Sequence, residues 1–164
     1  MDLFQIILLA FIQGLTEFLP ISSSGHLVLT PLLLGVEDQG LSFDIAVHIG
    51  SLLAVIIYFR REVTAITADT MGRLFFRQEA TADSQLGFAI AVATIPIVVA
   101  GGIYTLSGFE FRGPVIIAIA SILFGLLLWW ADTKPRPHEG ISQVTLNDAL
   151  IIGIFQILSI IPGT

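Results

Sequence analysis

The sequence predicts an all-α integral membrane protein, and its composition and three long apolar stretches carry that prediction. Of the 164 residues, 55% are hydrophobic and 12% are charged, and the mean hydropathy is +0.92. Soluble domains carry about 25% charged residues. Residues 41–59, 86–106 and 114–131 are each long and apolar enough to cross about 30 Å of hydrocarbon as a helix. We expect one membrane domain without disulfides, because the chain has no cysteine.

The basic residues predict how these helices are oriented. Of the seven basic residues, only Arg112 lies between the second and third spans. The other six lie on the opposite side, which the positive-inside rule makes cytoplasmic. They are Arg60, Arg61, Arg73, Arg77, Lys134 and Arg136. His138, in the loop after the third span, is expected to be solvated.

Residues 1–35 do not fit the spanning pattern. They are apolar but interrupted at Pro20 and again around Ser22–Gly25. Proline cannot continue a helix interior, and the residue before it favours extended backbone. We therefore predict a helix, a break and a short helix from about His26 to Leu34, forming a re-entrant hairpin. The alternative is one kinked spanning helix followed by an interfacial segment.

Residues 146–164 resemble this first segment. The stretches FIQGLTEFLPISS and IFQILSIIPGT share a glutamine, a later polar residue and a proline followed by small residues. We read 146–164 as the start of a second re-entrant hairpin. Counting the three spans between them, the two hairpins enter from opposite faces, as in inverted-repeat architectures with a site at the midplane. The chain stops at membrane depth, so we expect it to be part of a longer protein.

The stretch QGLTEFLPISSSGH, residues 13–26, carries the candidate chemistry. Gln13 and Glu17 are spaced i, i+4 and share one helix face. A carboxylate at membrane depth is costly and indicates function. Glu17 is therefore a candidate general base or ligand of a divalent cation.

The break after Glu17 predicts an anion-binding site. Three serines, Ser22, Ser23 and Ser24, precede Gly25 and a new helix that starts near His26. A helix start presents unpaired N–H groups and a positive dipole end, which suit phosphate. Ser23 could attack or bind, and a neutral His26 could be nucleophile or proton carrier. Taken singly, the serines also fit N-caps and the histidine a structural role.

Asp44 and His48 form another i, i+4 pair, within the 41–59 span. Asp44 lies near the outer surface and His48 lies deeper. A supporting role of His48 at the site is one interpretation, and hydrogen bonding between helices is the other.

The stretch QGLTEFLPISSSGH closely resembles the first signature of the bacterial undecaprenyl-diphosphate phosphatase family, of the bacitracin-resistance type. FDIAVHIGSLLAVIIYFRRE looks like the helix that follows it, and the final PGT looks like the start of the second signature, Pro-Gly-x-Ser-Arg-Ser. The resemblance covers the whole chain.

The resemblance implies hydrolysis of undecaprenyl diphosphate to the monophosphate carrier of cell-wall synthesis, with Mg or Ca as cofactor. By motif match, Glu17 is the essential acid, Ser23 the nucleophile or a phosphate ligand and His26 an essential neighbour. Gln13 takes a position that holds Glu or Gln. The arginine of the second signature would follow Thr164, so we expect the 164-residue chain alone to have little or no phosphatase activity.

Two other function classes compete with the phosphatase. A transporter or lipid flippase could use the same midplane site, and a structural membrane subunit would leave Glu17 unexplained. A transporter would need no hydroxyl nucleophile and should keep its transport in Ser23→Ala. We expect a multi-pass protein of the bacterial inner membrane, with a site facing the periplasm and a polyprenyl diphosphate as partner. No nucleic acid partner is expected, and the sequence does not decide whether the protein forms a homo-oligomer.

Overall fold

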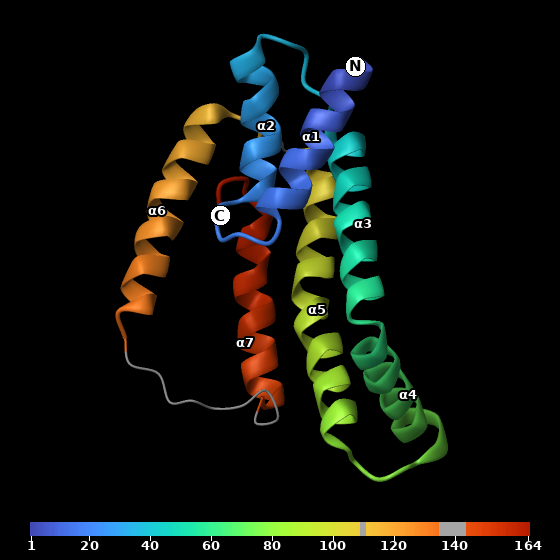
Figure 1. The fold of residues 1–164 in the computed structure, drawn as a ribbon. Helices are drawn as coiled ribbons and strands as arrows, with labels where there is room; N and C mark the ends of the chain where they lie inside the picture. Colours follow the sequence, from blue (N-terminus) through green and yellow to red (C-terminus); the bar gives the residue numbers. More distant parts are fainter. Residues whose placement is uncertain (109–110, 135–143) are drawn as a thin grey trace. The chain divides into compact units, whose positions relative to one another are not determined.

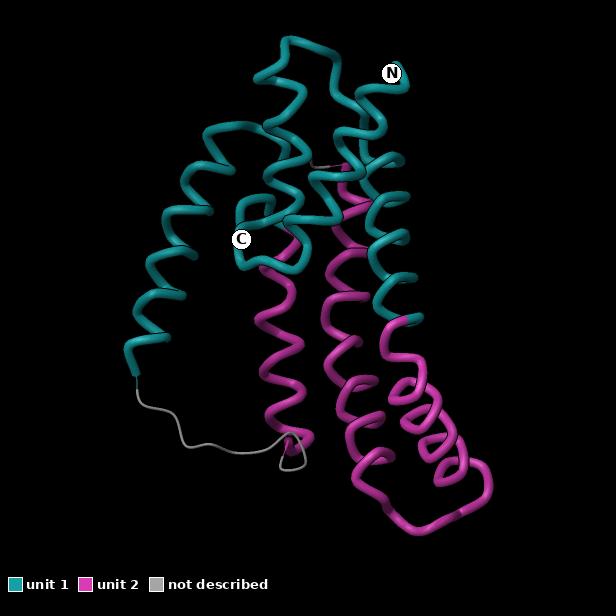
Figure 2. The backbone as a smooth tube through the Cα atoms, in the orientation of Figure 1, with its two compact units in different colours: residues 1–57, 110–134, 161–164 teal, residues 58–109, 135–160 magenta. Residues whose placement is uncertain are grey.

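The computed structural model describes residues 1–108, 111–134 and 144–164, and every regular element in these ranges is helical. The chain divides into two compact units, drawn in different colours in Figure 2. Unit 1 comprises residues 1–57, 110–134 and 161–164, and unit 2 comprises residues 58–109 and 135–160. Arg136 and His138, which the sequence placed in a loop, lie outside the described residues.

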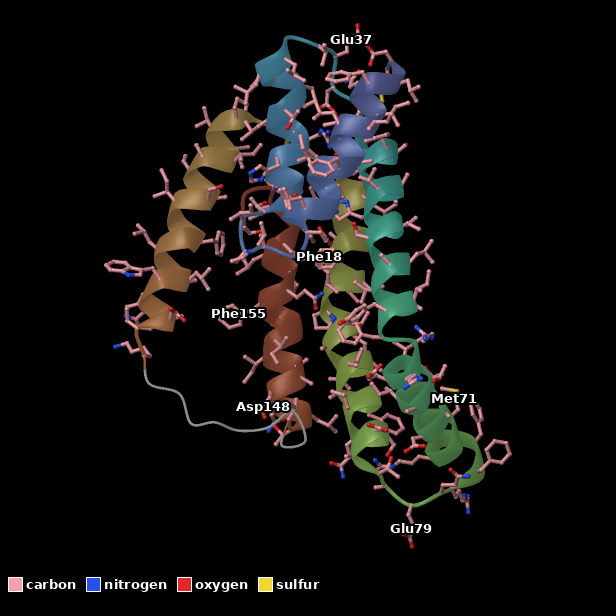
Figure 3. All side chains as sticks on the ribbon, in the orientation of Figure 1. Phe18, Glu37, Met71, Glu79, Asp148 and Phe155 are labelled. Carbon is pink, nitrogen blue, oxygen red and sulfur yellow. The ribbon has the colours of Figure 1, made fainter. Side chains whose placement is uncertain are left out.

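Unit 1 is built around two short helices joined by a break. Helix α1 (Leu3–Thr16) packs against α2 (Ser23–Leu34), and α2 also contacts α6 (Pro114–Asp132). Helix α3 (Leu41–Tyr58) belongs to this unit up to residue 57. The labelled Phe18 lies on the turn between α1 and α2, and Glu37 lies on the segment from α2 to α3 (Figure 3).

Unit 2 is a helical bundle centred on one long helix. Helix α5 (Ala82–Ser107) packs against α4 (Arg60–Phe76) and against α7 (Leu146–Gln156), which continues into a 3-10 turn, η2 (Ile157–Ile160). The labelled Asp148 stands at the start of α7 and Met71 near the end of α4 (Figure 3). These helices can be followed by their labels in Figure 1.

Three helices are long and apolar enough to span a membrane, as the sequence predicted: α3, α5 and α6. Only 11% of the most apolar window of each helix is buried inside the protein. Exposing this much apolar surface to water would be unfavourable, and burying it in lipid removes that cost. The chain is therefore an all-α membrane protein.

The break in the first segment both begins and ends earlier than predicted, since the sequence placed it at Pro20 and around Ser22–Gly25. Helix α1 ends at Thr16, and Glu17 to Pro20 form a turn. Helix α2 starts at Ser23, three residues before the predicted start at His26. The reason is that the Ser22 hydroxyl caps the helix, accepting the Gly25 N–H at 3.3 Å.

The segment between the first two spans contains a helix that the sequence pattern did not predict. Residues Arg60–Phe76 form helix α4. The segment contains no proline, but it also lacks a clear apolar face, so periodicity gave no helix signal. Packing explains the helix: α4 lies so close to α5 that a Cβ at Gly87 would overlap the Thr70 hydroxyl. Tertiary contact therefore stabilises a helix that the local pattern does not indicate.

Candidate active site

A cavity of about 830 Å³ in unit 1 brings the break of the first segment against α6. Its polar end is formed by Glu17, Ser22, Ser23 and His26. The lining that comes from α6 is largely apolar, with Phe124, Leu127, Leu128 and Ala131 among its residues. A cavity of this size with a polar end and an apolar wall is suited to an amphiphilic ligand.

One carboxylate oxygen, Glu17 Oε2, is the centre of the polar end. The Ser23 hydroxyl donates a hydrogen bond to it at 2.5 Å, and the Gln13 amide Nε2 donates another at 2.9 Å. His48 Nε2 lies 3.7 Å from the same oxygen. Short hydrogen bonds to an ionised acceptor are stronger than neutral ones, so the carboxylate and the hydroxyl are held together as a pair.

Glu17 reaches this position because α1 ends immediately before it. It is the C-cap residue, and its N–H still bonds the Gln13 carbonyl at 2.9 Å. The i, i+4 spacing therefore places the Gln13 side chain beside it, as predicted. Gln13 is 1% exposed, and its Oε1 has no hydrogen-bond partner among the described residues. A buried amide oxygen without a partner is costly and marks a place where a further donor or a cation fits.

His26 lies in the first turn of α2 and lines the same cavity. Its Nδ1 is 2.8 Å from the Ser22 carbonyl oxygen. A carbonyl only accepts, so Nδ1 carries the proton in this contact, and a neutral ring then has its lone pair on Nε2. The histidine is thereby fixed in the tautomer that can accept a proton.

Ser22 connects the break to the last residues of the chain. Its Oγ accepts the Gly163 N–H at 2.8 Å as well as the Gly25 N–H. Its φ of 55° is in the left-handed region, a strained conformation for a serine. Gly163 has a φ of 101°, and a Cβ there would lie 2.6 Å from the Ile117 carbonyl oxygen. The approach of residue 163 to α6 and to Ser22 therefore requires glycine.

The remaining predicted residues are placed as follows. Gly25 is buried, and a Cβ on it would come within 3.3–3.5 Å of Ser22 Oγ, Ile117 and the Gly163 amide. Ser24 lies in the first turn of α2 and is not among the residues that line the cavity. The structure therefore brings Gln13, Glu17, Ser22, Ser23, Gly25, His26 and His48 to one region and leaves Ser24 aside.

His48 is held on its other side by its own helix. Its Nδ1 lies 2.7 Å from the Asp44 carbonyl oxygen, so this nitrogen carries the proton and Nε2 faces Glu17. The Asp44 carboxylate accepts hydrogen bonds from Gln39 at 2.6 Å and from Arg112 at 2.7 Å. The His48 ring thus lies between Glu17 and the Asp44 backbone carbonyl, and the Asp44 side chain belongs to a charged network with Arg112.

Arg112 belongs to this network, a contact that the sequence did not predict. Its guanidinium bonds Asp38 through two nitrogens, at 2.6 and 3.1 Å, in addition to Asp44. Burial alone would raise the pKa of Asp38, but hydrogen bonds from Arg112 and the Gly40 amide, with the charge of Arg112, hold it below its usual value. Arg112 precedes α6, so the network ties the start of that helix to the α2–α3 connection and to Asp44 of α3. Its only sequence signal was its isolation from the other basic residues.

The residues around Glu17 fit a hard divalent cation only in part. Among the described residues, no group of three or more His, Cys, Asp or Glu side chains is arranged to hold a metal ion. The oxygens present are the Glu17 carboxylate, the Ser23 hydroxyl and the unpartnered Gln13 Oε1. Mg²⁺ is commonly held by one or two carboxylates, waters and substrate phosphates, so this set fits an ion that is bound together with a phosphate ligand.

Comparison with known proteins decides the family. Residues 6–164 match the family described as bacitracin resistance protein BacA. The chain belongs to this family. The resemblance drawn from the QGLTEFLPISSSGH stretch is thus confirmed over nearly the whole chain.

Curated relatives match over the whole chain. It is 50% identical over 171 residues to undecaprenyl-diphosphatase 2 of Stutzerimonas stutzeri (strain A1501) and 49% identical over 167 residues to the undecaprenyl-diphosphatase of Alteromonas mediterranea. A protein of the same name from Chromohalobacter salexigens is 50% identical over 165 residues. In each case the match covers 100% of this chain and 62% of the relative, so the chain spans less than two thirds of their length.

Proposed function

We propose that the full-length protein hydrolyses undecaprenyl diphosphate to undecaprenyl phosphate and inorganic phosphate. The observation that carries the proposal is the Ser23–Glu17 hydrogen bond of 2.5 Å at the polar end of a cavity that also holds His26 and an apolar α6 wall. The BacA relatives, named as diphosphatases of this lipid, support it. None of these names points to a transporter, so the transporter alternative has no support.

The geometry suits attack on a terminal phosphate. Glu17 is placed to accept a proton from the Ser23 hydroxyl, which makes that oxygen a better nucleophile. His26 Nε2 is the alternative nucleophile or a proton carrier, because its tautomer leaves a lone pair there. Attack on the terminal phosphorus breaks its bond to the bridging oxygen, and undecaprenyl phosphate leaves. Water then completes the hydrolysis.

Other residues of the cavity are suited to bind the phosphates and the prenyl chain of the substrate. Helix α2 begins at Ser23, so its first N–H groups and dipole favour a phosphate near the break. The α6 wall with Phe124 and Leu127 offers apolar contact to the start of a prenyl chain. Ser22 positions the backbone of the break through its bonds to Gly25 and Gly163.

We infer that the reaction depends on a divalent cation, Mg or Ca, held by Glu17 with oxygens from Gln13, Ser23 and the substrate. When bound, the cation would neutralise charge on the phosphates. We also infer a location in the bacterial inner membrane, with the site facing the periplasm. The distribution of basic residues supports this orientation, since Arg112 alone lies on the proposed outer side.

The test is phosphate release from a C55 or C15 polyprenyl diphosphate by the full-length protein in detergent. Wild type is compared with Ser23→Ala and with Thr105→Ala, an exposed hydroxyl on α5 in unit 2. Each is measured with a chelator and after addition of Mg²⁺ or Ca²⁺. We expect wild type and Thr105→Ala to release phosphate, the chelator to stop it and the added cation to restore it.

The rate of Ser23→Ala separates the two nucleophile assignments. A loss of about 10³-fold or more is expected if Ser23 attacks, and a loss of roughly tenfold if it only binds phosphate. Failure of wild type to release phosphate above a heat-inactivated sample would contradict the proposed function. Full activity in the presence of the chelator would contradict the cation.

A further inference from the structure

A second groove, of about 550 Å³, lies within unit 2 and takes no part in the candidate active site. Its lining residues come from the last turns of α4, the first half of α5 and residues 144–146 at the start of α7. Its apolar lining comes from Phe88, Val92, Val144 and Leu146, and its charged residue is Arg73.

Arg73 has no charged partner in the part of the chain that the structure describes. Its guanidinium carbon lies 5.2 Å from the centre of the Phe88 ring, within the range of a cation–π contact. Two acids on α4 and α7, Asp69 and Asp148, accept hydrogen bonds from the hydroxyls of Thr81 and Thr145, each at 2.6 Å. A half-buried arginine without a carboxylate is complementary to an external anion.

The helices place this cation at the level of lipid headgroups. Helix α5 has 26 residues and is about 39 Å long, which exceeds the roughly 30 Å of a hydrocarbon core. Its apolar run begins at Leu86, so its first turn extends out of the hydrocarbon and Phe88 lies at the boundary. Arg73, stacked on Phe88, therefore lies beside the phosphate layer, with the apolar lining of the groove toward the acyl chains.

We propose that this groove binds an anionic phospholipid, with its phosphodiester at Arg73 and an acyl chain along Phe88 and Val92. Free phosphate would use the guanidinium but gains nothing from the apolar lining. The proposal is independent of the hydrolytic function, because the groove and the candidate active site lie in different units.

The experiment measures lipid retention by native mass spectrometry of the full-length protein in detergent. The probes are phosphatidylglycerol, phosphatidylcholine and inorganic phosphate, each at the same concentration. Arg73→Gln removes the charge in the groove, and Val92→Trp fills the apolar part while keeping the charge. Arg61→Gln is the matched control, because Arg61 is an exposed arginine in the first turn of the same helix.

We expect wild type to retain phosphatidylglycerol in preference to phosphatidylcholine and inorganic phosphate. Arg73→Gln should weaken that binding about fivefold, the effect of one basic residue on an anionic lipid surface. Val92→Trp should weaken it as well, and Arg61→Gln should leave it unchanged. Equal losses in Arg73→Gln and Arg61→Gln, equal retention of the three probes, or unchanged binding in both groove variants would overturn the proposal.

Discussion

At the residue scale, the candidate site is defined by three side chains that contact one carboxylate oxygen, Glu17 Oε2. Ser23 and Gln13 donate to it within hydrogen-bond distance, whereas His48 stands at 3.7 Å, beyond that limit. About a third of each of the His48 and Glu17 side chains is exposed, so the protein encloses this pair only in part. The three contacts should therefore contribute unequally to phosphate release.

The first prediction concerns His48. In the full-length protein, His48→Ala should lower kcat for phosphate release by up to about fivefold, because a partly exposed pair without a hydrogen bond contributes up to about 1 kcal/mol. KM should change little, since His48 is not among the residues that line the cavity. His48→Asn, which restores a donor to the Asp44 carbonyl, should recover part of the rate. A loss as large as that of Ser23→Ala would mean that His48 takes part in the chemistry directly.

The second prediction concerns Asp38 and acid. The pKa of Asp38 in the folded protein is below its ordinary value near 3.8, so its ion pair with Arg112 stabilises the fold above that pH. This stabilisation should be lost as the pH falls through the lowered pKa. Melting temperatures of wild type and Asp38→Asn should thus differ by a constant amount from pH 7 to about 5 and converge below about pH 4. A difference that grows with acid would contradict the assignment.

Sequence patterns predicted the contacts between residues that are close in the sequence and missed those between residues that are far apart. The i, i+4 spacing placed Gln13 beside Glu17, and the serines before a helix start indicated the cap at Ser22. The hydrogen bond between Ser22 and Gly163 joins residues 141 positions apart, and the Arg112–Asp44 pair joins residues 68 apart. Local periodicity carries no information on such contacts, which arise only when the helices pack.

At the scale of elements, close helix packing in unit 2 depends on a glycine. A Cβ at Gly153 on α7 would overlap the backbone carbonyl of Ala93 on α5. Small residues at such contacts allow membrane helices to approach closely. The sequence predicted the apolar helices of this unit but not this contact. A helical glycine that packs against a neighbour cannot be distinguished by sequence from one that is exposed.

The third prediction tests that contact. Gly153→Ala should destabilise the full-length protein by about 1–3 kcal/mol, because the obstructing atoms are backbone and cannot rotate away. Gly101→Ala on α5 is the control, since nothing lies within 4 Å of a Cβ there. Alanine also favours a helix over glycine, so this variant should be neutral or slightly stabilising. Thermal unfolding in detergent measures both, and equal melting temperatures would argue against the close α5–α7 approach.

Helix α4 shows where element prediction failed. The three spanning helices were identified because lipid demands apolar residues on every side, which leaves a strong compositional signal. Helix α4 carries basic residues and a mixed pattern, and it is stabilised by packing on α5 rather than by its own periodicity. The same packing stacks Arg73 of α4 on Phe88 of α5 and so creates the second groove.

At the scale of the whole molecule, the two units differ in what they carry. Unit 1 holds the residues of the first signature, the cavity and the Arg112 network, and unit 2 holds the arginine-lined groove. The BacA relatives are longer than this chain, which covers 62% of their length. The proposed hydrolysis is therefore to be tested on the full-length protein, and Glu17 is the residue of unit 1 most central to the proposal.

The most direct measurement is the single-turnover rate of phosphate release by full-length Glu17→Gln, beside wild type and Glu79→Gln. Glu79 is an exposed acid on the connection between α4 and α5 (Figure 3). Glu17→Gln should lower the rate by about 10²–10⁴-fold, the usual contribution of a general base, with an unchanged melting temperature. Glu79→Gln should match wild type. If folded Glu17→Gln kept more than about a tenth of the wild-type rate, Glu17 would not be the essential acid of the site.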